Sequence, residues 1–154
     1  MKKLRKLIGL NPGDRRTLAH AMILLPLMAL ALRLTGLRRS QSIFSRIIPH
    51  NSARKPEQSE AALTQALRIS QLVGLAVRHG IYPANCLQQS LALWWLLRRQ
   101  GIRSELYIGT RKEAGRLDAH AWIEIEGVVL NDSSDVRHRY EPFDREILPQ
   151  FTRS

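Results

Sequence analysis

The chain has 154 residues, 44% of them hydrophobic, which suits one domain with a buried core. Its single cysteine, Cys86, excludes an intramolecular disulfide and a paired-cysteine metal or redox site, and it favours a reducing, cytoplasmic compartment. The net charge of +11 is unevenly placed, because residues 1–55 hold 12 of the 24 Lys and Arg but only one acid, Asp14. Residues 56–154 carry equal numbers of basic and acidic side chains, so we expect any anionic partner to contact the first third of the chain.

These patterns predict a basic, hydrophobic N-terminal helical region over residues 1–55 and a globular domain over 56–154. The most hydrophobic stretch, Thr17–Leu37, contains 12 consecutive apolar residues, Ala21–Leu32, fewer than the roughly 20 that a membrane span needs. Three interpretations remain open: a helix packed in the protein or against a partner, a helix on a membrane surface, or a signal peptide or span. Arg38–Lys55 is polar and is expected to be irregular.

Two further helices follow in the sequence. One is predicted from about Pro56 to Gly80, with apolar residues at helical spacing. The next runs from Cys86 to Gln100 and is apolar nearly all round, which is typical of a central, buried helix.

After Gly101 the hydrophobic period changes to two, which indicates strands. Strands are predicted near Ile102–Ile108, at Asp118–Ile125 and at Val128–Asp132, with Arg111–Leu117 as a polar loop and Glu126-Gly127 as a tight turn. The fold class is therefore α+β, with helices first and a small antiparallel sheet after them. The stretch from Ser133 onward carries little pattern.

Cys86, His120 and Asp132 form a candidate nucleophilic site. The start of a helix favours a thiolate, and a histidine oriented by a carboxylate is the base that such a nucleophile requires. In a hairpin turning at Glu126-Gly127, His120 and Asp132 face each other directly or one position apart. Each residue alone also has a structural interpretation: a small core hydrophobe, a strand histidine and a turn aspartate.

Three sequence blocks carry a family resemblance: Cys86-Leu87 at the head of a helix ending in Gly101-Ile102, then Leu106–Gly109, then Ala119–Glu124. In this order they resemble the transglutaminase-like cysteine proteases of lasso peptide biosynthesis, and more closely their short, stand-alone leader peptidase of the split B-protein type. The resemblance runs from about Tyr82 to Asp132. It implies a papain-like, transglutaminase-type core in which the cysteine helix packs on the antiparallel sheet.

The resemblance also implies an activity, the removal of a leader peptide from a ribosomally made precursor. Cys86 would attack the carbonyl at the leader–core junction, His120 would act as base and then acid, and Asp132 would orient His120. Asp135 and Glu124 are alternatives for the third position. Gln88, Gln89 and Asn85 are candidates for the oxyanion site, and neither a cofactor nor a metal is expected.

The implied partners are the leader peptide, a small leader-binding delivery protein and an ATP-dependent lasso cyclase that uses the freed core amino group. A membrane surface is a further candidate partner for residues 1–55, whereas nucleic acid is not expected because no binding motif accompanies the basic charge. Two other functions stay open. One is acyl transfer by the same three residues, and the other is a non-enzymatic basic adaptor acting through residues 1–55.

Overall fold

The structure is a computed structural model that describes residues 11–47 and 60–143, with side chains described in the first range only up to residue 34. Helices come first and a four-stranded antiparallel sheet follows, in the spatial order β3-β2-β1-β4, so the expected α+β class is confirmed. The elements in chain order are α2 (Pro12–Ile47), α3 (Glu60–His79), α4 (Cys86–Arg99), β1 (Glu105–Glu113), β2 (Arg116–Ile125), β3 (Val128–Val129), α5 (Val136–Arg139) and β4 (Glu141–Pro142).

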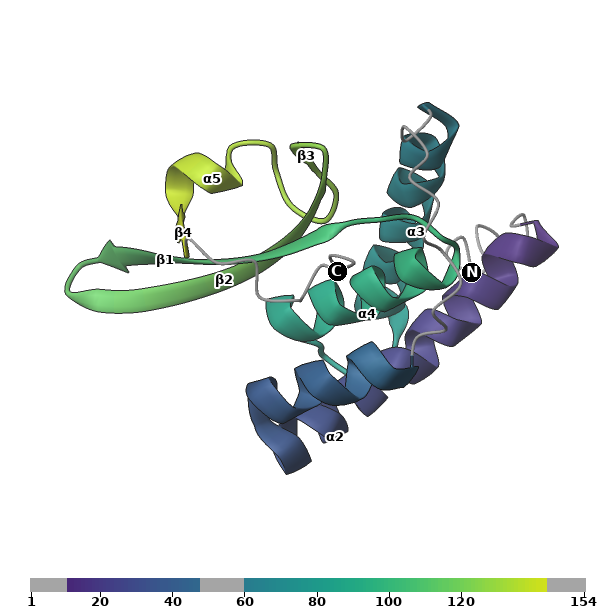
Figure 1. Ribbon diagram of the computed structural model, residues 1–154, viewed down its shortest axis with the longest axis horizontal. Helices are drawn as coiled ribbons and strands as arrows, with labels where there is room; N and C mark the ends of the chain where they lie inside the picture. The colour runs from purple at the N-terminus through teal and green to yellow at the C-terminus, as the bar shows by residue number, and fades with distance from the viewer. Residues whose placement is uncertain (1–10, 48–59, 144–154) are drawn as a thin grey trace, which may run out of the picture.

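Helix α4 is the central element, with the sheet on one side and α2 on the other (Figure 1). Both of its ends are fixed by local chemistry. At its start, the Asn85 side chain accepts from the Gln88 amide and the Gln88 side chain accepts from the Asn85 amide, which is a capping box. At its end, Gly101 adopts φ 75° and Ile102 donates to the Leu97 carbonyl, which is a Schellman motif.

One hydrophobic core joins the helices to the sheet. Helix α4 contributes the side chains that reach both layers, and α2, α3 and β2 contribute one face each. Its most buried members include Ala21, Leu25, Ala66, Leu72, Leu91, Leu93, Leu97, Leu106 and Ile123. The division expected at residue 55 lies in 48–59, outside the described residues, as do most of residues 1–11 and the expected helix start at Pro56.

Helix α2 confirms a helical N-terminal segment but is longer than expected. It begins at Pro12, with the Asn11 side chain accepting from the Asp14 amide, and continues to Ile47. The prediction that residues from Arg38 onward are irregular was therefore wrong for the described part. Arg and Gln are good helix formers, and no proline follows Pro26 until Pro49, so nothing in that stretch stops the helix.

The sheet contains a longer hairpin than the sequence pattern indicated. The predicted loop at Arg111–Leu117 is wrong, because β1 and β2 pair up to Glu113 and Arg116 around a two-residue turn. Ala114 and Gly115 in that turn both have positive φ, as do Glu126 and Gly127 in the expected second turn. Positive φ at both central residues is the geometry that matches the twist of paired strands. The long hairpin extends past the helices (Figure 1).

Substitution of Gly101 by alanine is expected to destabilise the protein by about 1 kcal/mol, because a Cβ is strained at φ 75°. Gly74→Ala is the matched control. It lies inside α3 with only the Arg78 side chain near its added Cβ, so we expect stabilisation by about 0.5–1 kcal/mol. Urea unfolding of the two variants measures both effects, and changes of the same sign would contradict this account of the α4 end.

Candidate active site

Cys86 is the first residue of α4 and is half-buried against the main core. The capping box occupies the amide of Gln88, and the Gln89 amide bonds to the Asn85 carbonyl. The amides of Cys86 and Leu87 make no hydrogen bond within the described part of the chain. The thiol therefore lies beside two open N–H groups at the positive end of a helix.

Ser90, one helical turn after Cys86, fixes α4 against β2. Its buried hydroxyl donates to the Ala121 carbonyl at 3.0 Å and accepts from Asn131 Nδ2 at 2.9 Å. Asn131 Oδ1 in turn accepts from the Ile123 amide at 2.8 Å. Two side chains thus hold together the start of α4, the strand that carries His120 and the loop that carries Asp132.

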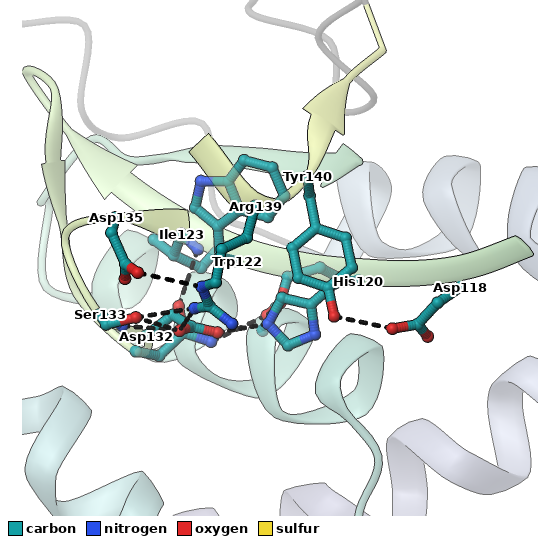
Figure 2. A network of polar contacts seen from close by, with 12 residues as sticks. Asp118, His120, Trp122, Ile123, Asp132, Ser133, Asp135, Arg139 and Tyr140 are labelled. Atoms are coloured by element: carbon teal, nitrogen blue, oxygen red, sulfur yellow. Dashed lines mark hydrogen bonds and ion pairs between the residues drawn. The ribbon is translucent and has the colours of Figure 1, made fainter. Parts of the chain in front are cut away.

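His120 and Asp132 are in direct contact, with His120 Nε2 hydrogen-bonded to Asp132 Oδ2. Their side chains are 24% and 18% exposed, so the pair remains within reach of solvent. The other carboxylate oxygen of Asp132 accepts from the amide and hydroxyl of Ser133 and from Arg139 Nη2 at 2.7 Å. Figure 2 shows Asp132 between Arg139 and the imidazole. Among the described residues His120 Nδ1 has no hydrogen bond, so it is the nitrogen available for chemistry.

The Asp132 carboxyl is biased towards its ionised form. Burial alone raises its pKa, but hydrogen bonds from Ser133 and His120 outweigh burial, so the pKa of Asp132 lies below its ordinary value. An ionised Asp132 holds a proton on Nε2 of the neutral ring and leaves Nδ1 as the basic nitrogen.

The His120 ring is also held from its face. Tyr140 stacks on it with ring centroids 5.0 Å apart, and the Tyr140 hydroxyl donates to Asp118 Oδ2 at 2.8 Å (Figure 2). Gly109 makes this packing possible, because it pairs with His120 across β1 and β2. A Cβ at Gly109 would lie 3.0 Å from the Trp122 ring and from Tyr140 Cβ, and 2.9 Å from the Glu141 carbonyl.

The route by which Asp132 reaches His120 differs from the expected one. Strand β3 ends at Val129, so Asp132 lies in the following loop and not on a strand facing His120. Leu130 still donates to the Ile123 carbonyl, but the Ile123 amide donates to Asn131 Oδ1 and not to the Leu130 carbonyl, which accepts from the Ser70 hydroxyl. The pairing is Glu124 with Val129, one position from direct opposition of His120 and Asp132.

The two alternative carboxylates have other partners. Glu124 is fully buried, accepts from Trp122 Nε1 and forms a two-point ion pair with Arg137 at 2.7 and 2.6 Å. Asp135 is exposed and pairs with Arg139 at 3.4 Å. Among the described carboxylates, Asp132 is the one that bonds to His120.

No hydrogen bond joins Cys86 to His120 within the described residues. The Ala121 carbonyl that Ser90 contacts points to the edge where the Asn131–Asp132 loop also lies. Cys86 precedes Ser90 by one turn, about 5.4 Å along the helix, and the His120 side chain lies on the face of β2 that it shares with Trp122 and Glu124. The thiol, imidazole and carboxylate therefore come from three elements that Ser90 and Asn131 hold together.

The sequence candidates for an oxyanion site cap the helix. Asn85 and Gln88 use their side-chain oxygens in the capping box, and Gln89 Nε2 donates to the Ala84 carbonyl.

The sequence did not indicate four residues that support the site: Ser90, Asn131, Arg139 and Tyr140. Ser90 lies inside an apolar helix, Asn131 at the end of a predicted strand, and Arg139 and Tyr140 in the stretch after Ser133 that carries little pattern, so no local signal marked them. No cluster of three His, Cys, Asp or Glu side chains able to hold a metal ion occurs in the described ranges.

Replacing Arg137 by methionine is expected to lower the free energy of unfolding by about 3 kcal/mol or more, because Glu124 is left buried without its partner. The exposed Arg116→Met, on the same sheet, is the control and should change stability by no more than about 0.5 kcal/mol. Equal decreases in the free energy of unfolding of the two variants, measured with urea, would mean that the Arg137–Glu124 ion pair does not stabilise the protein more than an exposed arginine does.

Asp132→Asn tests the charge on Asp132 through the pH dependence of stability. The folded pKa of Asp132 lies below its ordinary value of 3.8, so its ionisation favours the folded state above about pH 4, and this contribution is lost as pH falls through the lower folded pKa. The difference in unfolding free energy between wild type and variant should therefore shrink below about pH 4. Guanidinium unfolding between pH 3 and 7 measures it, and a constant difference would argue against an ionised Asp132.

Comparison with known proteins agrees with this architecture. Residues 28–144 match the family described as Transglutaminase-like superfamily. The chain is also 34% identical, over 59 residues, to the microcin J25-processing protein McjB of Escherichia coli. That similarity covers 38% of this chain and only 27% of McjB. No solved structure matches the chain. Because the family match extends over well more than half of the sequence, the chain belongs to the transglutaminase-like superfamily.

Proposed function

We propose that the protein is a cysteine peptidase that removes the leader peptide from a lasso peptide precursor. The observation that carries this proposal is the His120–Asp132 hydrogen bond, on a strand and a loop that Ser90 ties to the helix beginning at Cys86. The similarity to McjB, a protein named for processing the peptide microcin J25, supports a peptide precursor as the substrate. Asp132, Arg139 and Tyr140 restrict His120 on two sides, which suits a base that must keep one orientation.

The proposed reaction begins with the Cys86 thiolate attacking the carbonyl carbon of the last leader residue. The open amides of Cys86 and Leu87 are the donors for the oxyanion that forms. His120, protonated at Nδ1 by the thiol proton, gives that proton to the departing core amine as the C–N bond breaks. The leader is then held as a thioester on Cys86, and the core peptide leaves with a free N-terminus.

Water completes the proposed cycle. His120 Nδ1 removes a proton from a water molecule, which attacks the thioester carbonyl and releases the leader carboxylate. The proton returns to the Cys86 sulfur as the C–S bond breaks. Asp132 stays ionised throughout and stabilises the imidazolium form of His120. In this scheme a separate leader-binding protein delivers the precursor, and a separate ATP-dependent cyclase uses the freed amine.

Acyl transfer is the second candidate, because the superfamily is described as transglutaminase-like. It shares the thioester on Cys86, but an amine takes the place of water in the second step. Adding a primary amine to the reaction distinguishes the two. A peptidase releases a leader ending in a carboxylate, whereas an acyltransferase releases a leader amide whose mass differs from that of the acid by the amine minus one water.

Cleavage of a precursor peptide is expected to depend on all three residues to different degrees. Cys86→Ala and His120→Ala should abolish it, because they remove the nucleophile and the base. Asp132→Ala should slow it by about 100-fold or more, because the imidazole loses its orientation and its charge partner. Mass spectrometry of the precursor, incubated with the protein and a leader-binding partner, measures one cut at the leader–core junction.

Ser134→Ala is the matched control, because Ser134 is exposed in the same loop, and its cleavage rate should equal that of the wild type. Retained cleavage by Cys86→Ala would remove the nucleophile assignment. Absence of cleavage by the wild type, with true precursor and partner confirmed present, would turn the assignment towards acyl transfer or a non-enzymatic adaptor.

A further inference from the structure

Helix α2 presents an apolar face that no described residue covers. Met22, Ile23, Leu27, Leu30 and Leu34, which we call the α2 stripe, are between 37% and 75% exposed. The spacing of the last four keeps them on one side of the helix. The opposite side is buried in the main core. Single exposed aliphatic residues are ordinary, but a row of four on one side of a helix, with Met22 beside it, marks a surface that contacts another molecule.

The α2 stripe is bounded by positive charge at both ends. Exposed Arg15 and Arg16 precede it, and exposed Arg33 lies in its last turn. The only acid in residues 1–55, Asp14, is nearly buried and is bonded to Arg68 at 2.7 Å, so α2 itself places no carboxylate along the stripe. The whole net charge of the chain also falls within residues 1–55. The face is therefore apolar in its centre and basic at its margins.

We propose that the α2 stripe docks on the surface of an anionic lipid bilayer. An interfacial helix places aliphatic side chains among the acyl chains and basic residues at the level of the lipid phosphates, and α2 has both groups in that arrangement. The stripe contains no aromatic residue, whereas protein-binding surfaces concentrate binding energy in aromatic and arginine anchors within their centre. Its composition thus favours lipid over a protein partner.

The helix lies on the bilayer and does not cross it. The stretch Pro12–Leu34 is long and apolar enough to span a membrane, and 28% of it is buried in the protein. That buried side packs in one core with α3 and α4 through Leu18, Ala21 and Leu25. Crossing would require removal of this side from the core, whereas docking on the surface buries only what is already exposed.

This orientation leaves the candidate active site open to water. Helix α2 lies on one side of α4, and the β1–β2 hairpin, α5 and β4 lie on the other (Figure 1). The bilayer contact is independent of the proposed peptidase function, because no residue of the α2 stripe belongs to the active site.

Flotation of the full chain with vesicles tests the proposal. We expect binding to vesicles of phosphatidylcholine and phosphatidylglycerol in a ratio of 70 to 30, weaker binding to pure phosphatidylcholine, and a decrease on raising salt. The double variant Ile23→Glu/Leu30→Glu should bind at least about tenfold more weakly, because two aliphatic side chains no longer enter the acyl region. Leu117→Glu is the matched control, because Leu117 is 75% exposed on β2, away from the stripe.

The variants are used only if their circular dichroism and thermal unfolding match those of the wild type, and Leu27→Gln replaces the double variant if it does not fold. Binding by the control and loss in the stripe variant supports the proposal. Equal binding of wild type and stripe variant, or no binding to either vesicle, overturns it and leaves the face to a protein partner. Resistance of the bound protein to carbonate extraction would also overturn it, because a surface helix is released and a spanning helix is not.

Discussion

The buried hydroxyl of Ser90 is the contact on which the arrangement of the candidate site depends. It donates to the Ala121 carbonyl and accepts from Asn131, so one side chain on α4 bonds both to the strand of His120 and to the loop of Asp132. A buried hydroxyl without partners is unfavourable, and this one has a partner for its proton and for a lone pair. The three elements are consequently fixed in one relative position, which a reaction centre assembled from them requires.

A second set of contacts restricts His120 without using α4. Asp132 binds its Nε2, Tyr140 covers its face, and Arg139 neutralises the far oxygen of Asp132. The absence of a side chain at Gly109 lets Tyr140 approach β1 and β2. Further along the same face of β2, Glu124 is held by Arg137 and Trp122 and ties α5 to the sheet. The short helix α5 therefore stabilises the sheet through Arg137 and the position of His120 through Arg139.

In the described structure, the candidate active site and the α2 stripe lie on opposite sides of α4. The side with the sheet carries polar groups in a hydrogen-bonded network, and the side with α2 carries aliphatic residues bounded by arginines. A catalytic group needs fixed orientation and access to water, whereas a lipid contact needs only apolar area and positive charge. Both surfaces rest on the same helical core, so a protein attached to a bilayer through α2 keeps its candidate site facing the solvent.

Local signals in the sequence determined the elements whose ends depend on neighbouring residues. The α4 helix is bounded by the Asn85 cap and Gly101, and the second hairpin turns at Glu126-Gly127, because capping and positive φ are properties of a few adjacent residues. The order of Cys86, His120 and Asp132 also followed from sequence. Tertiary structure alone decided that β3 stops at Val129, that Glu124 pairs with Arg137 and that Arg139 and Tyr140 surround His120. It also decided which face of α2 is buried, because the apolar run Ala21–Leu32 carries no pattern that marks one face as inner, and only packing against α3 and α4 makes that choice.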